Sequence, residues 1–148
     1  MPGDETFFAT YWRPQQVNKP KGLVFLSHGY AEYFCPSYDE IAENLCSAGF
    51  LVFGHDHVGH GRSTGQRVQV QSLDDYVQPL ISHVRKVKMD FNDEIPAFII
   101  GHSMGGLISV YATLSDPDLF KGGFRTSVIT SLTNFNHSGT SVRAPFRN

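Results

Sequence analysis

Short apolar runs alternate along this chain with segments whose apolar residues recur at helical spacing. The continuous runs at residues 23–26, 50–53 and 96–100 are typical of strands that are covered on both faces of a parallel sheet. Residues 6–12 are rich in β-branched and aromatic side chains and end before Pro14, which predicts an edge strand. The pattern thus predicts four strands.

Three amphipathic segments predict helices between and after these strands. The first covers residues 38–46 and ends at Gly49, which suits the left-handed backbone beyond a helix. The second follows a capping-box pattern at residues 72–75 and runs to about residue 91, and the third stops at Asp116-Pro117. The apolar positions expected to face the core are Tyr38, Ile41, Ala42, Leu45, Cys46, Leu80, Ile81, Val84, Val87, Leu107, Ile108, Tyr111 and Leu114.

Strand and helix therefore alternate, which predicts the α/β class with a mostly parallel sheet, right-handed crossovers and flanking helices. The length of 148 residues and a hydrophobic content of 41% fit one globular domain or a large piece of one. A net charge of −2 without a basic patch argues against a nucleic-acid-binding protein.

The two cysteines, Cys35 and Cys46, have neither metal-site nor disulfide-framework spacing. This favours a reducing compartment, and we expect a cytoplasmic location. Residues 1–5 lack the charged and apolar regions of a signal peptide. Apolar runs are too short to span a bilayer, which leaves peripheral membrane contact open.

The composition changes near residue 124. Residues 125–148 are dominated by Ser, Thr and Asn, and no acidic residue follows Asp118. Beyond a short candidate strand at residues 128–130 there is no periodicity that could form an apolar face. We therefore predict a domain portion at residues 1–124 and a divergent, poorly ordered polar tail at 125–148.

Gly101-His102-Ser103-Met104-Gly105 matches the G-x-S-x-G pattern of a nucleophile elbow. A predicted strand precedes it and an amphipathic helix follows, which is the context that the motif requires. Ser103 is the candidate nucleophile, because the sharp turn points its hydroxyl away from the sheet beside a helix N-terminus. Side chains at 101 or 105 would clash in that turn.

A second candidate motif, Ser27-His28-Gly29-Tyr30, directly follows the strand at residues 23–26. Acyl transfer forms a tetrahedral oxyanion that needs two backbone N–H donors. In this architecture one comes from the residue after the nucleophile, here Met104, and the other from the loop after an early strand, here Tyr30. The alternative is that His28-Gly29 only forms a turn.

Together with residues 55–63, His-Asp-His-Val-Gly-His-Gly-Arg-Ser, these blocks resemble the monoacylglycerol lipase family. That family lies in the lysophospholipase and serine-aminopeptidase-like branch of the α/β-hydrolases, and the match runs from about Thr6 to Phe124. The resemblance implies an α/β-hydrolase fold without a cofactor. It also implies hydrolysis of monoacylglycerol esters to fatty acid and glycerol through an acyl-enzyme on Ser103, with Tyr30 and Met104 as backbone oxyanion-hole donors.

The resemblance also implies a triad acid and histidine after the serine, in that order. The only acidic residues after Ser103 are Asp116 and Asp118, and the only histidine is His137. Asp116 lies at the end of the predicted helix, about 20 Å from Ser103 at 1.5 Å per residue, which is too far for a shared histidine.

We therefore expect a fold truncated after the nucleophile-elbow helix and inactive alone. The alternative is a non-catalytic truncated or splice-variant product. Either could self-associate through an exposed sheet edge.

His55, His57 and His60 invite a metal-site interpretation, but their spacing matches no zinc motif. We expect no metal and a structural role, in which this block orders its loop through polar contacts. His102 is expected to be structural too. Tyr30, Tyr33 and Phe34 could line an acyl pocket or pack the loop, and the sequence does not separate these two roles.

Overall fold

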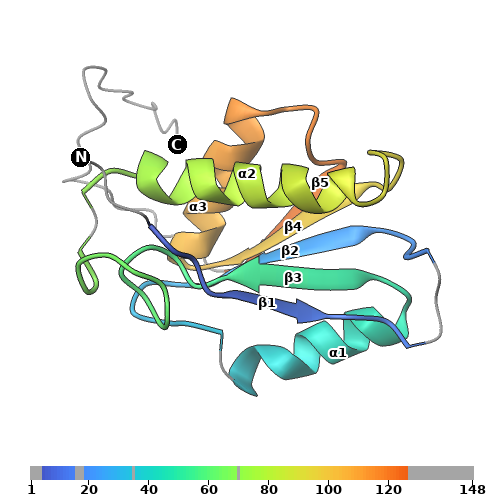
Figure 1. The fold of residues 1–148 in the computed structure, drawn as a ribbon, viewed down its shortest axis with the longest axis horizontal. Coiled ribbons are helices and arrows are strands. Elements are labelled where there is room, and N and C mark those ends of the chain that lie inside the picture. The colour runs from blue at the N-terminus through green and yellow to red at the C-terminus, as the bar shows by residue number, and fades with distance from the viewer. Residues whose placement is uncertain (1–4, 16–18, 35, 70, 127–148) are drawn as a thin grey trace, which may run out of the picture.

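The computed structural model describes residues 5–15, 19–34, 36–69 and 71–126. Within these ranges five strands form one sheet in the order β1-β3-β2-β4-β5 (Figure 1). The strands are β1 (Ala9–Trp12), β2 (Leu23–Ser27), β3 (Leu51–His55), β4 (Ala97–His102) and β5 (Gly122–Thr126). β1 is an antiparallel edge strand and all other pairs are parallel. The predicted α/β class and the predicted edge strand are confirmed.

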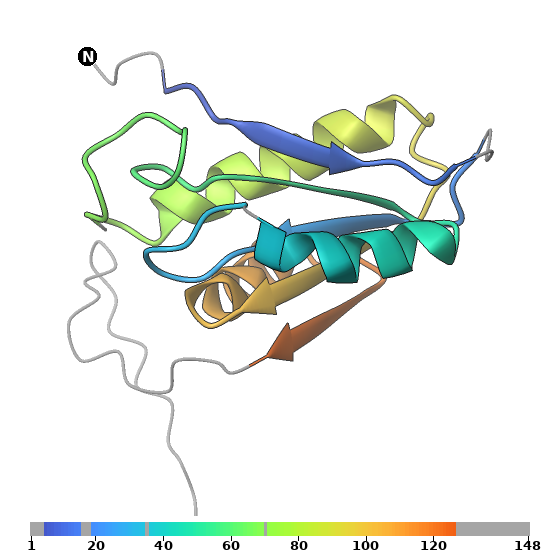
Figure 2. The same ribbon diagram turned by 90° about the horizontal axis from the view of Figure 1, so that it is seen from below.

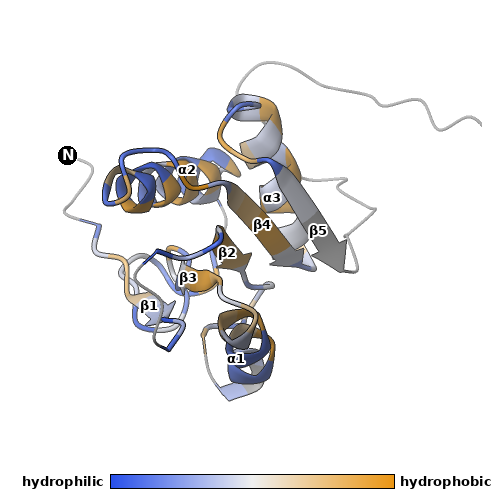
Figure 3. Ribbon diagram, turned by 90° about the vertical axis from the view of Figure 1, so that its right-hand side faces the viewer, coloured by the Kyte–Doolittle hydropathy of each residue, from blue (hydrophilic) through white to orange (hydrophobic). Residues whose placement is uncertain are grey.

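Helices cover both faces of this sheet. A short 3-10 helix, η1 (Pro36–Tyr38), leads into α1 (Asp39–Ser47) on one face. α2 (Asp74–Met89) and α3 (Met104–Ser115) pack on the other face, as Figures 2 and 3 show. The three predicted helices are therefore confirmed.

The predicted ends of these helices are present as well. Gly49 has φ 97° just beyond α1, a backbone region that glycine adopts without strain. At the start of α2, Ser72 Oγ accepts a hydrogen bond from Asp74 N, and Asp75 Oδ2 accepts one from Ser72 N. This reciprocal arrangement is a capping box with Asp75 in place of glutamate.

Each face of the sheet carries its own hydrophobic cluster. The smaller one, under α1, consists of Val24, Leu26, Phe34, Ala42 and Val52. The larger one lies between the sheet and the pair α2 and α3, and its members include Phe25, Phe53, Tyr76, Leu80, Val84, Ile99 and Ile108. Every residue of β2 and β3 is buried, so these two strands are covered on both faces as predicted.

Three predictions about burial are wrong. Ile41 is 41% exposed, because α1 packs on the sheet through Ala42, with Leu45 and Cys46 beside it. Leu114 is 71% exposed, because the face of α3 that meets the sheet is formed by Gly105, Ile108 and Ala112. β4 is buried on one face only, since Phe98 and Ile100 are half-buried. With neighbouring residues of β2, α1 and β5 they line an apolar groove beside α1.

β5 was not predicted, and it spans the boundary expected at residue 124. It pairs with β4 alone among the described residues, so self-association through this edge stays a prediction. The candidate strand at 128–130 and the rest of the tail lie outside the described residues. The domain division thus stays a prediction, as does peripheral membrane contact. No described helix is long and apolar enough to cross a membrane.

Two leucines on helices test this assignment of the core. Leu80 on α2 is fully buried and Leu114 on α3 is 71% exposed. We expect Leu80→Ala to lower the free energy of unfolding by about 3 kcal/mol, because it removes packed atoms and leaves a cavity. Leu114→Ala, the control, should change it by less than about 0.5 kcal/mol. Urea denaturation followed by circular dichroism measures both, and equal effects would contradict the assignment.

Candidate active site

The candidate site lies at the carboxyl ends of β2, β3 and β4, which point to the same edge of the sheet (Figure 1). Ser27, the last residue of β2, pairs with Gly101 near the end of β4. The loop after β2 and the turn after β4 therefore leave the sheet side by side. This pairing brings the two predicted motifs together.

Ser103 forms a tight turn between β4 and α3, with φ 52° and ψ −118°. This backbone is strained for a residue with a side chain and costs about 1–3 kcal/mol. The side chain is half-buried, so its hydroxyl is not enclosed in the packed core. The predicted strained turn is therefore present.

The neighbouring glycines make this turn possible. A Cβ on Gly101 would lie 2.3 Å from the carbonyl oxygen of Gly105. A Cβ on Gly105 would lie 2.0 Å from the carbonyl oxygen of Ser27. Such distances are far inside van der Waals contact, so the predicted clash at both positions is confirmed. The first turn of α3 lies directly against the end of β2.

The two predicted oxyanion donors lie on these adjacent segments. Met104 begins α3, so its N–H is one of the first four of the helix, at the positive end of the helix dipole. Tyr30 lies in the loop after β2, and its ring is half-exposed. No described residue accepts a hydrogen bond from the backbone N–H of either one, whereas the N–H of Gly29 is already bound to Glu32. The role of these two amides remains a prediction.

His28 is buried and anchors the loop after β2. Its Nδ1 donates to the carbonyl oxygen of Gly29 at 2.8 Å, and its Nε2 accepts from the backbone N–H of His57 at 2.9 Å. The bond that Nε2 accepts needs the neutral ring, because both nitrogens of a protonated ring are donors. Burial, partly offset by the Gly29 hydrogen bond, lowers the pKa of His28 to about 4. His28 is thus a structural link between the loops after β2 and β3.

Asp56 organises the loop after β3. Its Oδ1 accepts from the backbone N–H of Phe34, and its Oδ2 accepts from that of Arg62. Ser63 Oγ donates to the backbone carbonyl of Asp56 and accepts from the N–H of Phe8. Gly61, with φ 49°, leaves the room that the Asp56 carboxylate occupies. The structural role predicted for this block is confirmed, with Asp56 at its centre.

Two histidines of this block, His55 and His57, are buried and neutral. Burial, with smaller effects of neighbouring histidines, lowers the pKa of His55 to about 3 and that of His57 well below its ordinary value. His60 is also buried and donates from Nδ1 to the carbonyl oxygen of Val58. Within the described ranges no group of three or more potential ligands could hold a metal ion.

The three aromatic residues of the β2 loop divide into two roles. Phe34 is buried against Trp12, His28 and Tyr38 and belongs to the core under α1. Phe34 therefore packs the loop. Tyr30 and Tyr33 are about half-exposed at the surface of the site, and Tyr30 donates from its hydroxyl to the carbonyl oxygen of Val68.

The acidic residues that follow Ser103 do not contribute to the candidate site. Asp116 ends α3 and accepts hydrogen bonds from Arg85 of α2 at 2.8 and 3.2 Å. Asp118 is exposed near the same end of that helix. His137 lies outside the described residues. No histidine forms a hydrogen bond with the Ser103 hydroxyl in the part of the chain that the structure describes.

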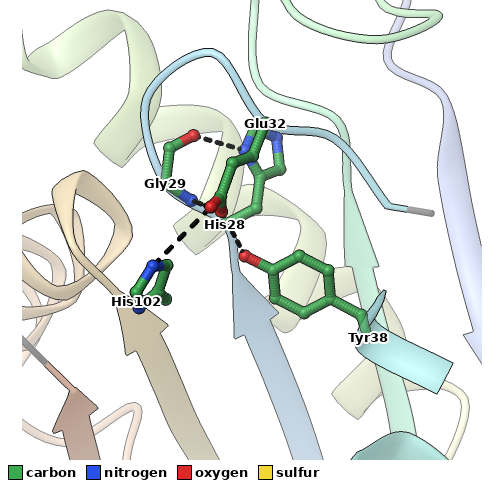
Figure 4. Close-up of polar contacts among 5 residues, drawn as sticks. All are labelled: His28, Gly29, Glu32, Tyr38 and His102. Atoms are coloured by element: carbon green, nitrogen blue, oxygen red, sulfur yellow. Dashed lines mark hydrogen bonds and ion pairs between the residues drawn. The ribbon is translucent and has the colours of Figure 1, made fainter. Parts of the chain in front are cut away.

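Glu32 and Tyr38 contribute to the site and were not predicted. Glu32 Oε2 accepts from the backbone N–H of Gly29 at 2.8 Å and from the Tyr38 hydroxyl at 2.5 Å (Figure 4). Its Oε1 lies 3.6 Å from Nε2 of His102, the residue before Ser103. A glutamate three residues after Gly29 is a weak sequence signal, because the contact with His102 spans 70 positions.

Comparison with protein families identifies the chain. Residues 18–133 match the family described as serine aminopeptidase, S33. The chain belongs to this serine aminopeptidase S33 family. The match extends beyond the point near Phe124 at which the sequence resemblance was expected to stop.

The S33 match agrees with individual relatives. The monoglyceride lipase of Rattus norvegicus is 46% identical over 115 residues, which cover 78% of this chain and 37% of that protein. The monoglyceride lipase homolog of monkeypox virus is 43% identical over 117 residues, covering 79% and 41%. The chain thus spans about two fifths of the length of these curated relatives.

Solved structures agree as well. The monoacylglycerol lipase of Paleococcus ferrophilus has a TM-score of 0.71 and 26% identity, covering 90% of this chain and 47% of that one. A soluble variant of the Saccharomyces cerevisiae monoglyceride lipase, solved with a substrate analog, also has a TM-score of 0.71 and 26% identity, covering 83% and 41%. The S33 chain therefore has the α/β-hydrolase fold.

The approach of α3 to β2 predicts unequal effects of alanine at two glycines. Gly105→Ala should lower the free energy of unfolding by about 3 kcal/mol, because its Cβ meets the Ser27 backbone, which cannot move aside. Gly122→Ala is the control: its Cβ would lie 3.5 Å from the Phe98 ring, an ordinary contact. We expect a change below about 1 kcal/mol there. Chemical denaturation of both variants tests this, and a neutral Gly105→Ala would contradict the geometry.

The buried histidines predict loss of stability in mild acid. The unfolded chain takes up protons from the ordinary pKa of 6.5 downward, whereas His28 and His55 stay neutral in the fold until about pH 4 and 3. As the pH falls from 6.5 to about 4, each such histidine should lower the free energy of unfolding by up to about 1.4 kcal/mol per pH unit. Urea midpoints at pH 7.5, 6.0 and 5.0 measure this, and unchanged midpoints would contradict it.

Proposed function

We propose that this chain carries the nucleophile and the oxyanion hole of a serine ester hydrolase of the monoacylglycerol lipase type. Ser103 attacks the ester carbonyl, and the backbone N–H groups of Tyr30 and Met104 stabilise the oxyanion that forms. The proton of the Ser103 hydroxyl is transferred to the leaving oxygen, glycerol leaves, and the acyl group stays on Ser103. Water then cleaves the acyl ester, which releases the fatty acid and restores the hydroxyl. The observation that carries the proposal is the strained Ser103 turn, packed by Gly105 against the strand that leads into the Tyr30 loop.

The substrate class is supported by the relatives. The rat protein is named a monoglyceride lipase, and the yeast structure holds a substrate analog. The half-exposed rings of Tyr30 and Tyr33 place apolar surface beside the proposed oxyanion donors, which suits an ester with an acyl chain. No residue of this proposed reaction requires a cofactor.

The described residues favour a second candidate, a non-catalytic product, because they contain no aligned base. His28 and His57 are buried and neutral, and His102 faces Glu32. Without a general base the Ser103 hydroxyl stays protonated and is a weak nucleophile. We therefore propose that the chain alone turns over little substrate, even if the oxyanion hole is formed.

Labelling with a fluorophosphonate probe tests the proposed nucleophile. We expect slow phosphonylation of Ser103, because an oxyanion hole and binding alone retain about 10³–10⁴-fold catalysis over water when a triad is incomplete. Intact-protein and peptide mass spectrometry locate the adduct. Hydrolysis of a monoacylglycerol, followed by fatty acid release, should exceed the uncatalysed rate by no more than about 10³–10⁴-fold.

Two variants make this labelling specific. Ser103→Ala should abolish the adduct, and Ser115→Ala, at an exposed position at the end of α3, should leave it unchanged. No adduct at Ser103 under excess probe would sink the enzymatic proposal and favour the non-catalytic product. Rapid labelling with fast ester hydrolysis would instead show that a base is present in the chain.

A further inference from the structure

The loop that carries Tyr30 is held in an unfavourable backbone conformation. Ala31, the next residue, has φ 59°, which is strained for alanine and persists only when its surroundings fix it. The turn is closed by a long hydrogen bond, 3.4 Å, from Glu32 N to the carbonyl oxygen of Gly29. Backbone bonding within the turn is therefore weak, and other contacts must hold the Tyr30 amide in place.

The side chain of Glu32 supplies such contacts. Its carboxylate folds back over the turn and accepts hydrogen bonds from Gly29 N and the Tyr38 hydroxyl, as Figure 4 shows. On its other side it faces His102 of β4, 3.6 Å away. One carboxylate thus connects the loop that carries Tyr30, the 3-10 helix η1 and the end of β4, directly before Ser103.

The charge of this carboxylate is favoured by its surroundings. Partial burial raises the pKa of Glu32, but the hydrogen bonds from Tyr38 and Gly29, with smaller contributions from His102 and His28, outweigh it and lower the pKa. Hydrogen bonds to an ionised group are about twice as strong as those between neutral groups. The Gly29 bond is therefore a stronger restraint on this turn than the 3.4 Å backbone bond that closes it.

The absence of a side chain at residue 29 is part of the same arrangement. A Cβ on Gly29 would lie 2.9 Å from Glu32 Oε2 and 3.4 Å from the His102 ring. Gly29 thus lies between the carboxylate and the histidine, and its N–H points at Glu32. That N–H is therefore used within the loop, whereas no described residue accepts a hydrogen bond from the next amide, that of Tyr30.

We propose that Glu32 is a positioning residue for the oxyanion hole, whose carboxylate fixes the Tyr30 amide relative to Ser103 by binding Gly29 and Tyr38 and facing His102. The inference rests on the proposed function of Ser103 and Tyr30. It assigns Glu32 no contact with the reacting atoms: the side chain acts through the backbone of its own turn.

Hydrogen exchange of single amides, followed by NMR at pH 7, tests the restraint without any catalysis. Glu32→Ala should speed exchange of the Gly29 amide about tenfold or more, because it removes the hydrogen bond from this amide to a charged group. Tyr38→Phe, which keeps the carboxylate and removes one donor, should speed it about threefold. The matched controls Glu40→Ala and Tyr33→Phe, at exposed positions, should have no effect.

Exchange at Phe25 and Phe53, in the centre of the sheet, distinguishes local release from global unfolding. These amides should be unchanged in Glu32→Ala and Tyr38→Phe. Equal acceleration at the core and at Gly29, or no acceleration at Gly29 in either variant, would overturn the proposal. Because Tyr38→Phe leaves Glu32 intact, the test survives if Glu32→Ala fails to fold.

The labelling reaction supplies a second readout that a purely structural role would not move. Glu32→Gln should lower the maximal rate of Ser103 phosphonylation about tenfold, less than the 10²–10³-fold cost of removing an oxyanion donor itself. The concentration of probe at half-maximal rate should stay unchanged. A loss of affinity at constant maximal rate would contradict positioning. If the unaltered chain is not labelled, the proposed function fails while the exchange result still decides the role of Glu32.

Discussion

The close approach of α3 to the end of β2 is the constraint on which the whole site depends. A Cβ on Gly105 would come within 2.0 Å of the Ser27 carbonyl oxygen, so the helix start and the strand end touch through their backbones. Pairing of Ser27 with Gly101 sets the level at which the two segments leave the sheet. The serine turn and the donor loop are therefore placed by main-chain packing, which no change of side-chain rotamer can alter.

Polar side chains order the loops at this edge of the sheet. Neutral His28 joins the loops after β2 and β3, and Asp56 accepts hydrogen bonds from backbone N–H groups of both loops. Each of these buried groups satisfies amides that the sheet leaves unpaired, as burial requires. The edge of the sheet is thus ordered by a small set of His, Asp and Glu side chains, and the proposed chemistry uses none of them directly.

Much of this architecture could be predicted from local sequence patterns. The apolar runs located three strands, and the β-branched and aromatic residues at 6–12 located the edge strand. The helical periodicity located three helices, and the glycines around Ser103 indicated a crowded turn. β5 was missed because Gly122 and Gly123 have low strand propensity, and the strand forms by pairing with β4. Leu114 was misplaced because periodicity does not show that the small residues of α3 face the sheet.

The contacts of Glu32 were beyond local prediction for a different reason. They join Glu32 to Tyr38 six positions away and to His102 seventy positions away, so only the folded sheet brings them together. The roles of Asp56 were hidden in the same way, because Phe34 and Arg62 approach it from two different loops.

The positive φ of Ser103 determines which residue selection favours at this position. Glycine adopts φ near 52° without strain, so the residue that fits this corner most comfortably is chemically inert. Stability and chemical reactivity thus make opposite demands on residue 103. A laboratory selection for thermal stability alone would favour glycine at residue 103. Retention of serine there implies selection for a property other than stability.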